Sequence, residues 1–216
     1  MTGPVRPAIA GYWSAVPGSN ALSVQSRLNS VHRSAGWSMA WSAAFVSYVV
    51  CASGIGESAA FERSDAHFVY VDQAIRNAQT SSPTGLFRAR DIATGLPRIG
   101  DLLCADRAAN NEPSYQTLAA RQADIGSRRF MHCDLVVAVN RRGNYVAVIG
   151  GNVVQAVSMT MVGIKPATRS APARVVTEFD DITSRPWFAV LELQDGGSDA
   201  SLAATPAIQA LPVANR

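Results

Sequence analysis

The chain has 216 residues, of which 48% are apolar and 16% are charged. This composition allows a complete hydrophobic core and excludes general disorder. The length suits one domain of about 150–200 residues with tails. The formal charge is +3, but Lys165 is the only lysine and no Lys/Arg run exceeds two residues. A nucleic-acid-binding surface needs a denser basic stripe, so we expect no nucleic-acid partner.

Targeting features are missing from the sequence. Residues 1–7 contain no basic start followed by an apolar stretch of signal-peptide length. No window approaches 18 uninterrupted apolar residues, so we expect no membrane-spanning segment. The expectation is a soluble protein without an ordinary signal peptide. A target in the periplasm or cell wall would then require delivery by a phage, a lysis system or a secretion machine.

The first half of the chain predicts helices. Residues 38–53 are apolar on almost every side, which indicates a buried central helix that Ser38 caps and Gly54 ends. Apolar residues also recur at helical spacing from Ser64 to Gln79, with Ser64 or Asp65 as the expected cap. We expect, in chain order, a flexible start over 1–8, a short helix over 9–13, a loop over 17–36 with one helical turn near 24–28, and helices over 38–53 and 64–79.

The second half predicts strands. We expect a turn or edge strand over 86–90, a strand over 102–105, an insertion over 106–129 with a helical turn near 115–123, and strands over 133–140, 145–150, 153–161 and 187–193. Helices followed by an antiparallel sheet make an α+β fold. The domain would span residues 9–193, followed by a disordered or linker-like tail over 194–216.

The cysteines are three, Cys51, Cys104 and Cys133, and they lack the paired spacing of a disulfide framework or a metal site. Cys104 and Cys133 each lie in an apolar run, which is typical of a buried free thiol. We therefore expect free thiols, and neither a metal nor an organic cofactor.

A hydroxyl, an imidazole and an amide occur in an order that suits acyl transfer. Ser42 begins an apolar helical stretch, His132 opens an apolar strand, and Asn152 follows two glycines at the end of the next strand. A nucleophile needs a base and a group that orients the base. Asp134 lies two residues beyond His132, on the same side of a strand, and is a competing orienter. Trp41 would form a wall of the site or of the core.

Other interpretations stay open for each candidate. Ser42 is a working nucleophile, a remnant in a non-catalytic binding domain, or an ordinary serine of a helix start. Asn152 is either the orienter or a turn residue in the left-handed conformation. His67, with Ser64 and Tyr70 one turn away on either side, is structural support for its helix or the next candidate for the base.

Several short motifs resemble the bacterial family catalogued as domain of unknown function 2272, which is related to the NlpC-type and CHAP-type cell-wall peptidases and amidases. The resemblance covers about residues 9–193. The motifs are Tyr12-Trp13, Trp41-Ser42-Ala43-Ala44-Phe45-Val46, Phe61-x-x-Ser64-x-x-His67-x-x-Tyr70, Gly100-Asp101-Leu102, His132-Cys133-Asp134 and Gly150-Gly151-Asn152-Val153.

This resemblance implies a papain-like fold, with a central N-terminal helix on an antiparallel sheet of about five strands. It places Ser42 where the relatives have a catalytic cysteine, with His132 as base and Asn152 as orienter. The implied activity is hydrolysis of an amide bond in peptidoglycan, as an antibacterial effector with an immunity protein or as a lysis enzyme. The rivals are a non-catalytic cell-wall-binding module, an acyltransferase or lipid-modifying enzyme, and an interaction domain of a larger assembly.

Overall fold

The computed structural model describes residues 5–32, 37–55, 60–81, 84–107, 114–177 and 185–194. The predicted disordered tail beyond Gln194 and half of the predicted flexible start lie outside these residues. Among the described residues, four helices precede the first strand, and only η1 and α5 lie among the strands of the sheet, so the predicted α+β class is confirmed. The helices are α1 (Val5–Ser14), α2 (Ala21–His32), α3 (Ser42–Ala52), α4 (His67–Gln79), the 3-10 turn η1 (Ile92–Thr94) and α5 (Leu118–Ala123).

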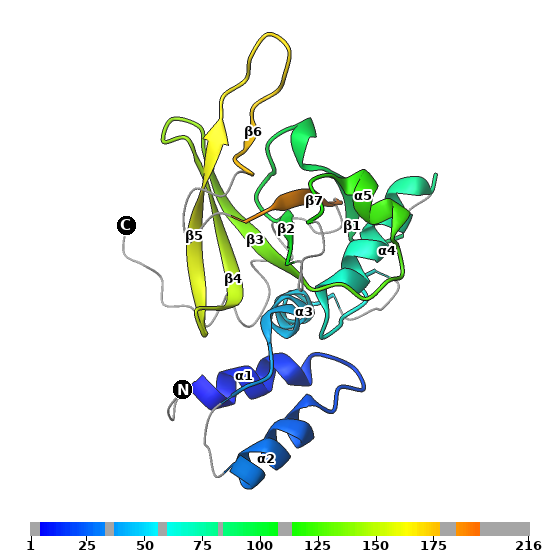
Figure 1. Ribbon diagram of the computed structural model, residues 1–216, viewed down its shortest axis with the longest axis vertical. Helices are drawn as coiled ribbons and strands as arrows, with labels where there is room; N and C mark the ends of the chain where they lie inside the picture. Colours follow the sequence, from blue (N-terminus) through cyan, green and yellow to red (C-terminus); the bar gives the residue numbers. More distant parts are fainter. Residues whose placement is uncertain are drawn as a thin grey trace.

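Helix α3 is the central helix, and it lies between α1 and the sheet (Figure 1). Its apolar side chains Ala44, Phe45 and Val46 are buried on different sides of the helix, as the continuous apolar pattern predicts. The predicted start at Ser38 is wrong, because the hydroxyl of Ser38 bonds Gln25 Oε1 and lies before the helix. The helix begins at Ser42 instead, directly after Trp41.

The helix α2 replaces the loop that was predicted over residues 17–36. Local composition, rich in serine and glycine, favours a loop, but tertiary contacts hold the helix. The side chain of Gln25 is buried, and its Oε1 accepts the backbone N–H groups of Ser38 and Met39 at 2.9 and 3.2 Å. The pair α1–α2 forms a layer on the side of α3 that faces away from the sheet (Figure 1).

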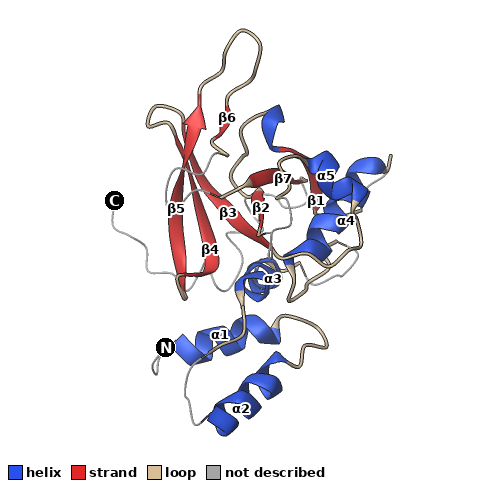
Figure 2. Ribbon diagram, in the orientation of Figure 1, coloured by secondary structure: helices blue, strands red, loops and turns tan. Residues whose placement is uncertain are grey.

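The sheet has seven strands in the order β1-β7-β2-β3-β4-β5-β6, not about five as predicted. All pairings are antiparallel, and the sheet curls strongly (Figure 2). The prediction missed the two-residue strand β6 and left β1 open as a turn or edge strand. The strands are β1 (Phe87–Asp91), β2 (Leu102–Asp106), β3 (Met131–Asn140), β4 (Tyr145–Val153), β5 (Ala156–Lys165), β6 (Arg174–Val175) and β7 (Trp187–Leu193).

Strands β3 and β4 separate at one end of the sheet. Strand β3 pairs with β2 over Met131–Leu135, but its pairing with β4 begins only at Leu135 and runs to Asn140. The first residues of β3 therefore have an open edge toward β4, and unpaired edge groups need other partners. Helices α3 and α4 both pack against β3, and α3 also packs against β4. Side chains from these helices occupy the fork.

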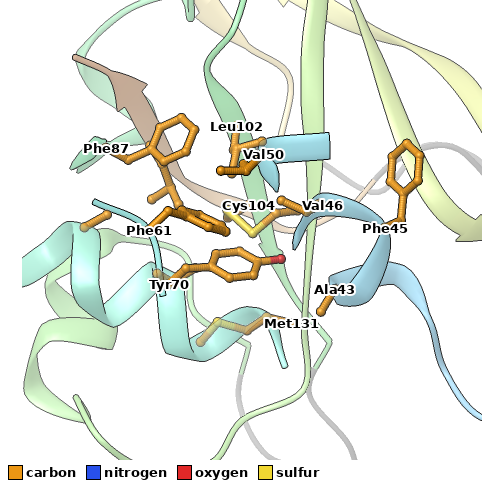
Figure 3. Packing of buried hydrophobic residues seen from close by; sticks show 14 of the residues in the cluster. Ala43, Phe45, Val46, Val50, Phe61, Tyr70, Phe87, Leu102, Cys104 and Met131 are labelled. Carbon is orange, nitrogen blue, oxygen red and sulfur yellow. A yellow bond between two sulfur atoms is a disulfide. The ribbon is translucent and has the colours of Figure 1, made fainter. Parts of the chain in front are cut away.

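The larger hydrophobic cluster joins α1, α3 and α4 to one face of the sheet. Figure 3 shows the part of it around α3 and α4. Tyr70 of α4 lies within it beside Phe61 and Met131, and its hydroxyl points toward α3 (Figure 3). A second cluster lies on the other face, around Trp187 and Val148. Among the described residues, no helix has the length and apolar character needed to cross a membrane.

Candidate functional site

A disulfide joins Cys104 and Cys133 at the base of the fork, with an S–S distance of 2.11 Å. The prediction of free thiols at these two positions is wrong. Spacing along the chain could not reveal the bond, because antiparallel pairing of β2 with β3 places the two residues directly opposite each other. Cys51 is the free cysteine of the chain.

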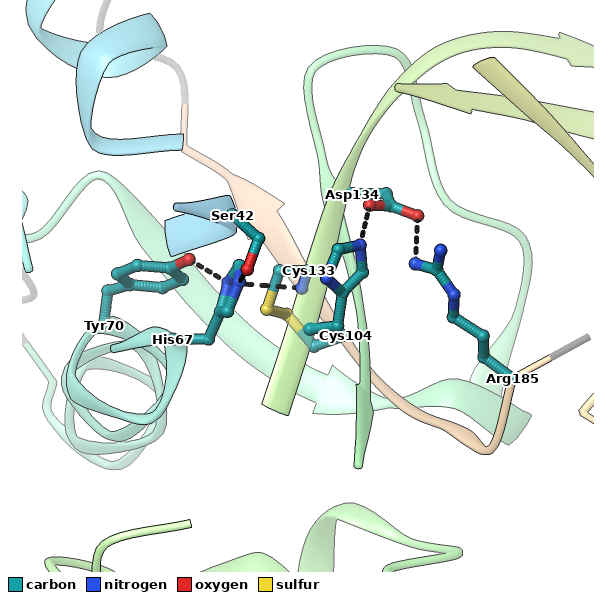
Figure 4. The surroundings of a disulfide bond; sticks show 8 residues. Ser42, His67, Tyr70, Cys104, Cys133, Asp134 and Arg185 are labelled. Carbon is teal, nitrogen blue, oxygen red and sulfur yellow. Dashed lines mark hydrogen bonds and ion pairs between the residues drawn. A yellow bond between two sulfur atoms is a disulfide. The ribbon is translucent and has the colours of Figure 1, made fainter. Parts of the chain in front are cut away.

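The first histidine of the site, His67, closes the open edge of β3. It is the first residue of α4, and its Nδ1 accepts the backbone N–H of Cys133 at 3.2 Å. A strand partner would otherwise accept this N–H, and a buried N–H without an acceptor costs about 1–3 kcal/mol. The hydroxyl of Tyr70, one turn along α4, also contacts Nδ1 (Figure 4).

The serine of the site bonds the other nitrogen of the same ring. Ser42 Oγ lies 2.8 Å from His67 Nε2 (Figure 4). Ser42 is the first residue of α3, where free N–H groups and the helix dipole favour negative charge. The structure thus joins Ser42 to His67 and Tyr70, whereas the sequence pattern paired Ser42 with His132.

The contacts of His67 determine its tautomer. A backbone N–H can only donate, so Nδ1 must be the unprotonated nitrogen. Burial, followed by the nearby His132, Arg107 and Arg185, lowers the pKa of His67 well below its usual value. The ring is therefore neutral near pH 7, with its proton on Nε2. In this state His67 donates to Ser42 Oγ and does not accept the serine proton.

The second histidine, His132, belongs to a separate ion-pair chain. Its Nε2 lies 2.6 Å from Asp134 Oδ1, and Asp134 Oδ2 lies 2.8 Å from Arg185. Alternation along β3 places His132 and Asp134 on one side of the strand and Cys133 on the other. The carboxylate that orients His132 is therefore Asp134, and Figure 4 shows Asp134 between the two dashed contacts.

A carboxylate can only accept, so its contact with Nε2 favours the neutral tautomer of His132 that carries the proton on Nε2. Burial lowers the pKa of His132, while Asp134 opposes the shift. Both ring nitrogens of His132 are buried, and neither makes a hydrogen bond of standard geometry among the described residues, but Nε2 lies within ion-pair distance of Asp134 Oδ1, at 2.6 Å. The rings of His67 and His132 are 5.3 Å apart. The site thus contains one imidazole that donates and a neighbouring one that has a free acceptor.

Two glycines of β4 allow this close packing. A Cβ at Gly150 would lie 1.9 Å from Asp134 Oδ1 and 3.0 Å from His132 Nε2. A Cβ at Gly151 would lie 2.4 Å from the Cβ of Phe45. Any side chain at these positions would push β4 away from the ion pair or from α3. The Gly-Gly pair is therefore a packing requirement of the fork.

The remaining predicted residues lie around this cluster. Asn152 has a φ of 58°, the left-handed value of the turn interpretation. Its Oδ1 is buried and has no hydrogen-bond partner among the described residues, so Asn152 does not hold His132. Trp41 is buried and stacks on Tyr12 at 5.6 Å. Ser64 Oγ accepts the N–H of Ala66, and its backbone bonds Ser47 of α3 at 2.9 and 3.0 Å, which fixes the start of α4.

The cluster is largely shielded from water. Ser42 retains 8% of its surface, His67 4% and His132 1%. Within the described ranges, no group of three or more His, Cys, Asp and Glu side chains could hold a metal ion. The available chemistry is that of a hydroxyl bonded to one neutral imidazole, with a second neutral imidazole 5.3 Å from the first. Such perturbed and buried titratable groups are typical of functional sites.

Sequence reasoning missed Arg185 and the disulfide. Arg185 reaches Asp134 across 51 positions of the chain, and no motif surrounds it. The only available indication was Asp134 itself, since a buried carboxylate requires a cation or several donors.

Residues 8–193 match the family described as "Uncharacterized protein conserved in bacteria (DUF2272)". The chain belongs to this family. No curated protein and no solved structure matches it. The predicted family is thus confirmed, and the family carries no assigned activity that could be transferred to the site.

Proposed function

We propose that this DUF2272 protein is a papain-like amide hydrolase of the NlpC type that cleaves peptidoglycan. Ser42 is the nucleophile, His132 the base and Asp134 the group that orients the base. The observation that supports this assignment most directly is the pair of opposite contacts: His67 donates to Ser42, whereas His132 keeps a buried, unpartnered Nδ1. The helix start, the following β-strand histidine and their chain order support the relation to NlpC-type enzymes.

The reaction follows from these protonation states. Ser42 Oγ attacks the amide carbonyl carbon while its proton passes to His132 Nδ1. Asp134 stabilises the resulting imidazolium, and the start of α3 faces the developing negative charge. The C–N bond then breaks, and His132 returns the proton to the leaving amine. Water hydrolyses the acyl-serine by the same path in reverse. His67 positions Ser42 throughout by donating from Nε2.

The low exposure of Ser42 and His132 sets a condition on this mechanism. Only 8% of the surface of Ser42 and 1% of that of His132 are exposed to solvent. A polymer can therefore reach Ser42 Oγ only after neighbouring side chains move. The same burial favours a second candidate function, a cell-wall-binding domain in which the cluster only stabilises the fork. Both functions fit the fold, and turnover distinguishes them.

The test uses purified sacculi and measures released muropeptides. Wild type should release them, and Ser42→Ala should not. The His132→Gln variant should release muropeptides about 10²–10⁴-fold more slowly than wild type, because the substitution removes the base. His67→Gln should retain measurable activity, since an amide N–H can still donate to Ser42. Melting temperatures establish that each variant is folded. Loss with His67→Gln but not with His132→Gln would assign the base to His67. Wild type that co-sediments with sacculi without releasing muropeptides would support the binding domain.

The destination that fits this function is the periplasm or cell wall, with an immunity protein as a protective partner in the producing cell. The Cys104–Cys133 disulfide supports an oxidising compartment, where such bonds persist. Growth tests this part of the proposal. Wild type directed to the periplasm of a susceptible bacterium should arrest growth, whereas cytoplasmic wild type and periplasmic Ser42→Ala should not.

A further inference from the structure

Two arginines lie at the end of the sheet that carries His132. The N–H of Asp106 donates to the carbonyl of Pro186 at 3.3 Å, so the end of β2 lies beside the start of β7. Arg107 and Arg185 are the residues that flank this contact. The N–H of Arg107 also donates to the carbonyl of Phe130 at 2.9 Å, two residues before His132. Arg107, Arg185 and His132 therefore lie on three adjacent strand ends.

The charges at this end of the sheet do not balance. Asp134 pairs with Arg185 at 2.8 Å, and Asp106 pairs with Arg129 at 2.6 Å. Arg107 is exposed and has no ion pair within the described residues. The two histidines are neutral near pH 7 and add no charge. One positive charge of this group is left without a counter-charge among the described residues.

Arg107 is close enough to affect both histidines and Arg185. After burial, its charge is among the causes that lower the pKa of His67, of His132 and of Arg185. Arg185 itself is 20% exposed at the side chain, and its described hydrogen bond to Asp134 uses only Nη1. A guanidinium carries five N–H donors, so donors remain on both arginines.

We propose that Arg107 and Arg185 form a carboxylate-binding subsite beside Ser42 and His132, and that the ligand is a peptide with a free carboxylate. Guanidinium groups bind carboxylates through two parallel hydrogen bonds, which also fixes the orientation of the bound group. This subsite adds a substrate-binding element to the proposed function. The identity of the peptide rests on that proposed function. It holds the acidic end of the substrate, so that one particular amide bond lies at Ser42.

A binding experiment tests the subsite without turnover. N-acetyl-D-alanyl-D-alanine and its C-terminal amide are titrated separately into the Ser42→Ala protein, and NMR shifts of the backbone amides are followed. The acid should bind at least about tenfold more tightly than the amide and shift the signals of Arg107 and His132. Arg107→Gln should remove this preference. Arg142→Gln, a change at the exposed β3–β4 turn, should preserve it.

Equal affinity for acid and amide, a preference that survives Arg107→Gln, or no binding of the acid would overturn the subsite. The outcome is separate from that of the sacculus assay. A protein that binds the acid through Arg107 but releases no muropeptides has the subsite and lacks the proposed hydrolase activity. If Arg107→Gln does not affect hydrolysis and the two probes bind equally, the hydrolase proposal stands and the subsite proposal is overturned.

Discussion

The backbone N–H of Cys133 donates to Nδ1 of His67 at 3.2 Å, across 66 positions of the chain. This one bond links the disulfide-bearing strand to the serine, because the opposite ring nitrogen bonds Ser42. It also fixes which nitrogen of His67 carries the proton. The division of roles between the two histidines follows from it.

Nuclear magnetic resonance can read the two tautomers directly. Long-range ¹H–¹⁵N spectra of the wild type at pH 7.5 should show His67 and His132 neutral and protonated on Nε2. The backbone N–H of Cys133, which can only donate, requires this tautomer at His67, and the carboxylate of Asp134 favours it at His132. A spectrum with the proton of His67 on Nδ1 would make His67 the acceptor of the serine proton and contradict the assigned roles. His67→Gln and His132→Gln supply the assignments.

Stability should fall as the pH drops below about 6.5, the ordinary histidine value. Burial lowers the pKa of both His67 and His132 in the folded protein. The unfolded chain therefore binds protons first, and the free energy of unfolding rises with pH over this range. The slope reaches at most ~1.4 kcal/mol per pH unit for each histidine. Above about pH 7 both states are neutral at these positions, and this contribution is constant.

Urea unfolding between pH 5.5 and 8 measures this slope. The double variant His67→Gln, His132→Gln should flatten the profile. Replacement of the exposed His32 by Gln should leave it unaltered. A wild-type profile that is already flat from pH 7 to 5.5 would mean that the two rings are not held neutral.

The disulfide should contribute about 3–4 kcal/mol to the free energy of unfolding. Its closed loop spans a sequence separation of 29, and the chain-entropy relation gives this magnitude. Cys104→Ala with Cys133→Ala, compared with wild type in urea, tests the value. Thiol titration of the denatured wild type without reductant should find one thiol, Cys51. Three reactive thiols would show that the bond does not form.

Removal of the Asp134 charge should destabilise the protein by about 3 kcal/mol, since it leaves Arg185 without its buried partner. Asp134→Asn also deprives His132 Nε2 of its acceptor. Glu62→Gln is the matched control, because the Glu62–Arg76 pair is about half exposed at 3.9 Å. Its loss should cost less than ~1 kcal/mol. Chemical unfolding at pH 7.5 compares the two variants.

Alanine at two glycines should have opposite effects. Gly150→Ala introduces a Cβ against Asp134 and His132, which should destabilise the fold by about 1–3 kcal/mol. Gly11→Ala in α1 meets no atom within 4 Å, and it should stabilise the helix by about 0.5–1 kcal/mol. Thermal unfolding measures both. Equal melting temperatures would contradict the tight packing of β4 on the ion pair.

Patterns of neighbouring residues were sufficient for most elements. The apolar stretch around Phe45 predicts the central helix, and the alternation after Cys133 predicts the strands, because burial of one face acts within a few residues. Elements that depend on distant contacts were missed. Helix α2 relies on Gln25 bonding the segment at Ser38, and β6 relies on two residues of β5.

The sequence by itself identified the family and most residues of the cluster, since residue types and their order are written in the chain, but it did not reveal Arg185 or the disulfide. Only the tertiary structure decided which of them bond. The divergence of β3 from β4 leaves one N–H open, and His67 accepts it. With this contact on Nδ1, His67 bonds Ser42 through its other ring nitrogen, whereas His132 pairs with Asp134. Hydrogen bonds between residues far apart in the chain depend on the angle and register at which strands pack. Neither quantity can be inferred from the pattern of neighbouring residues in the sequence.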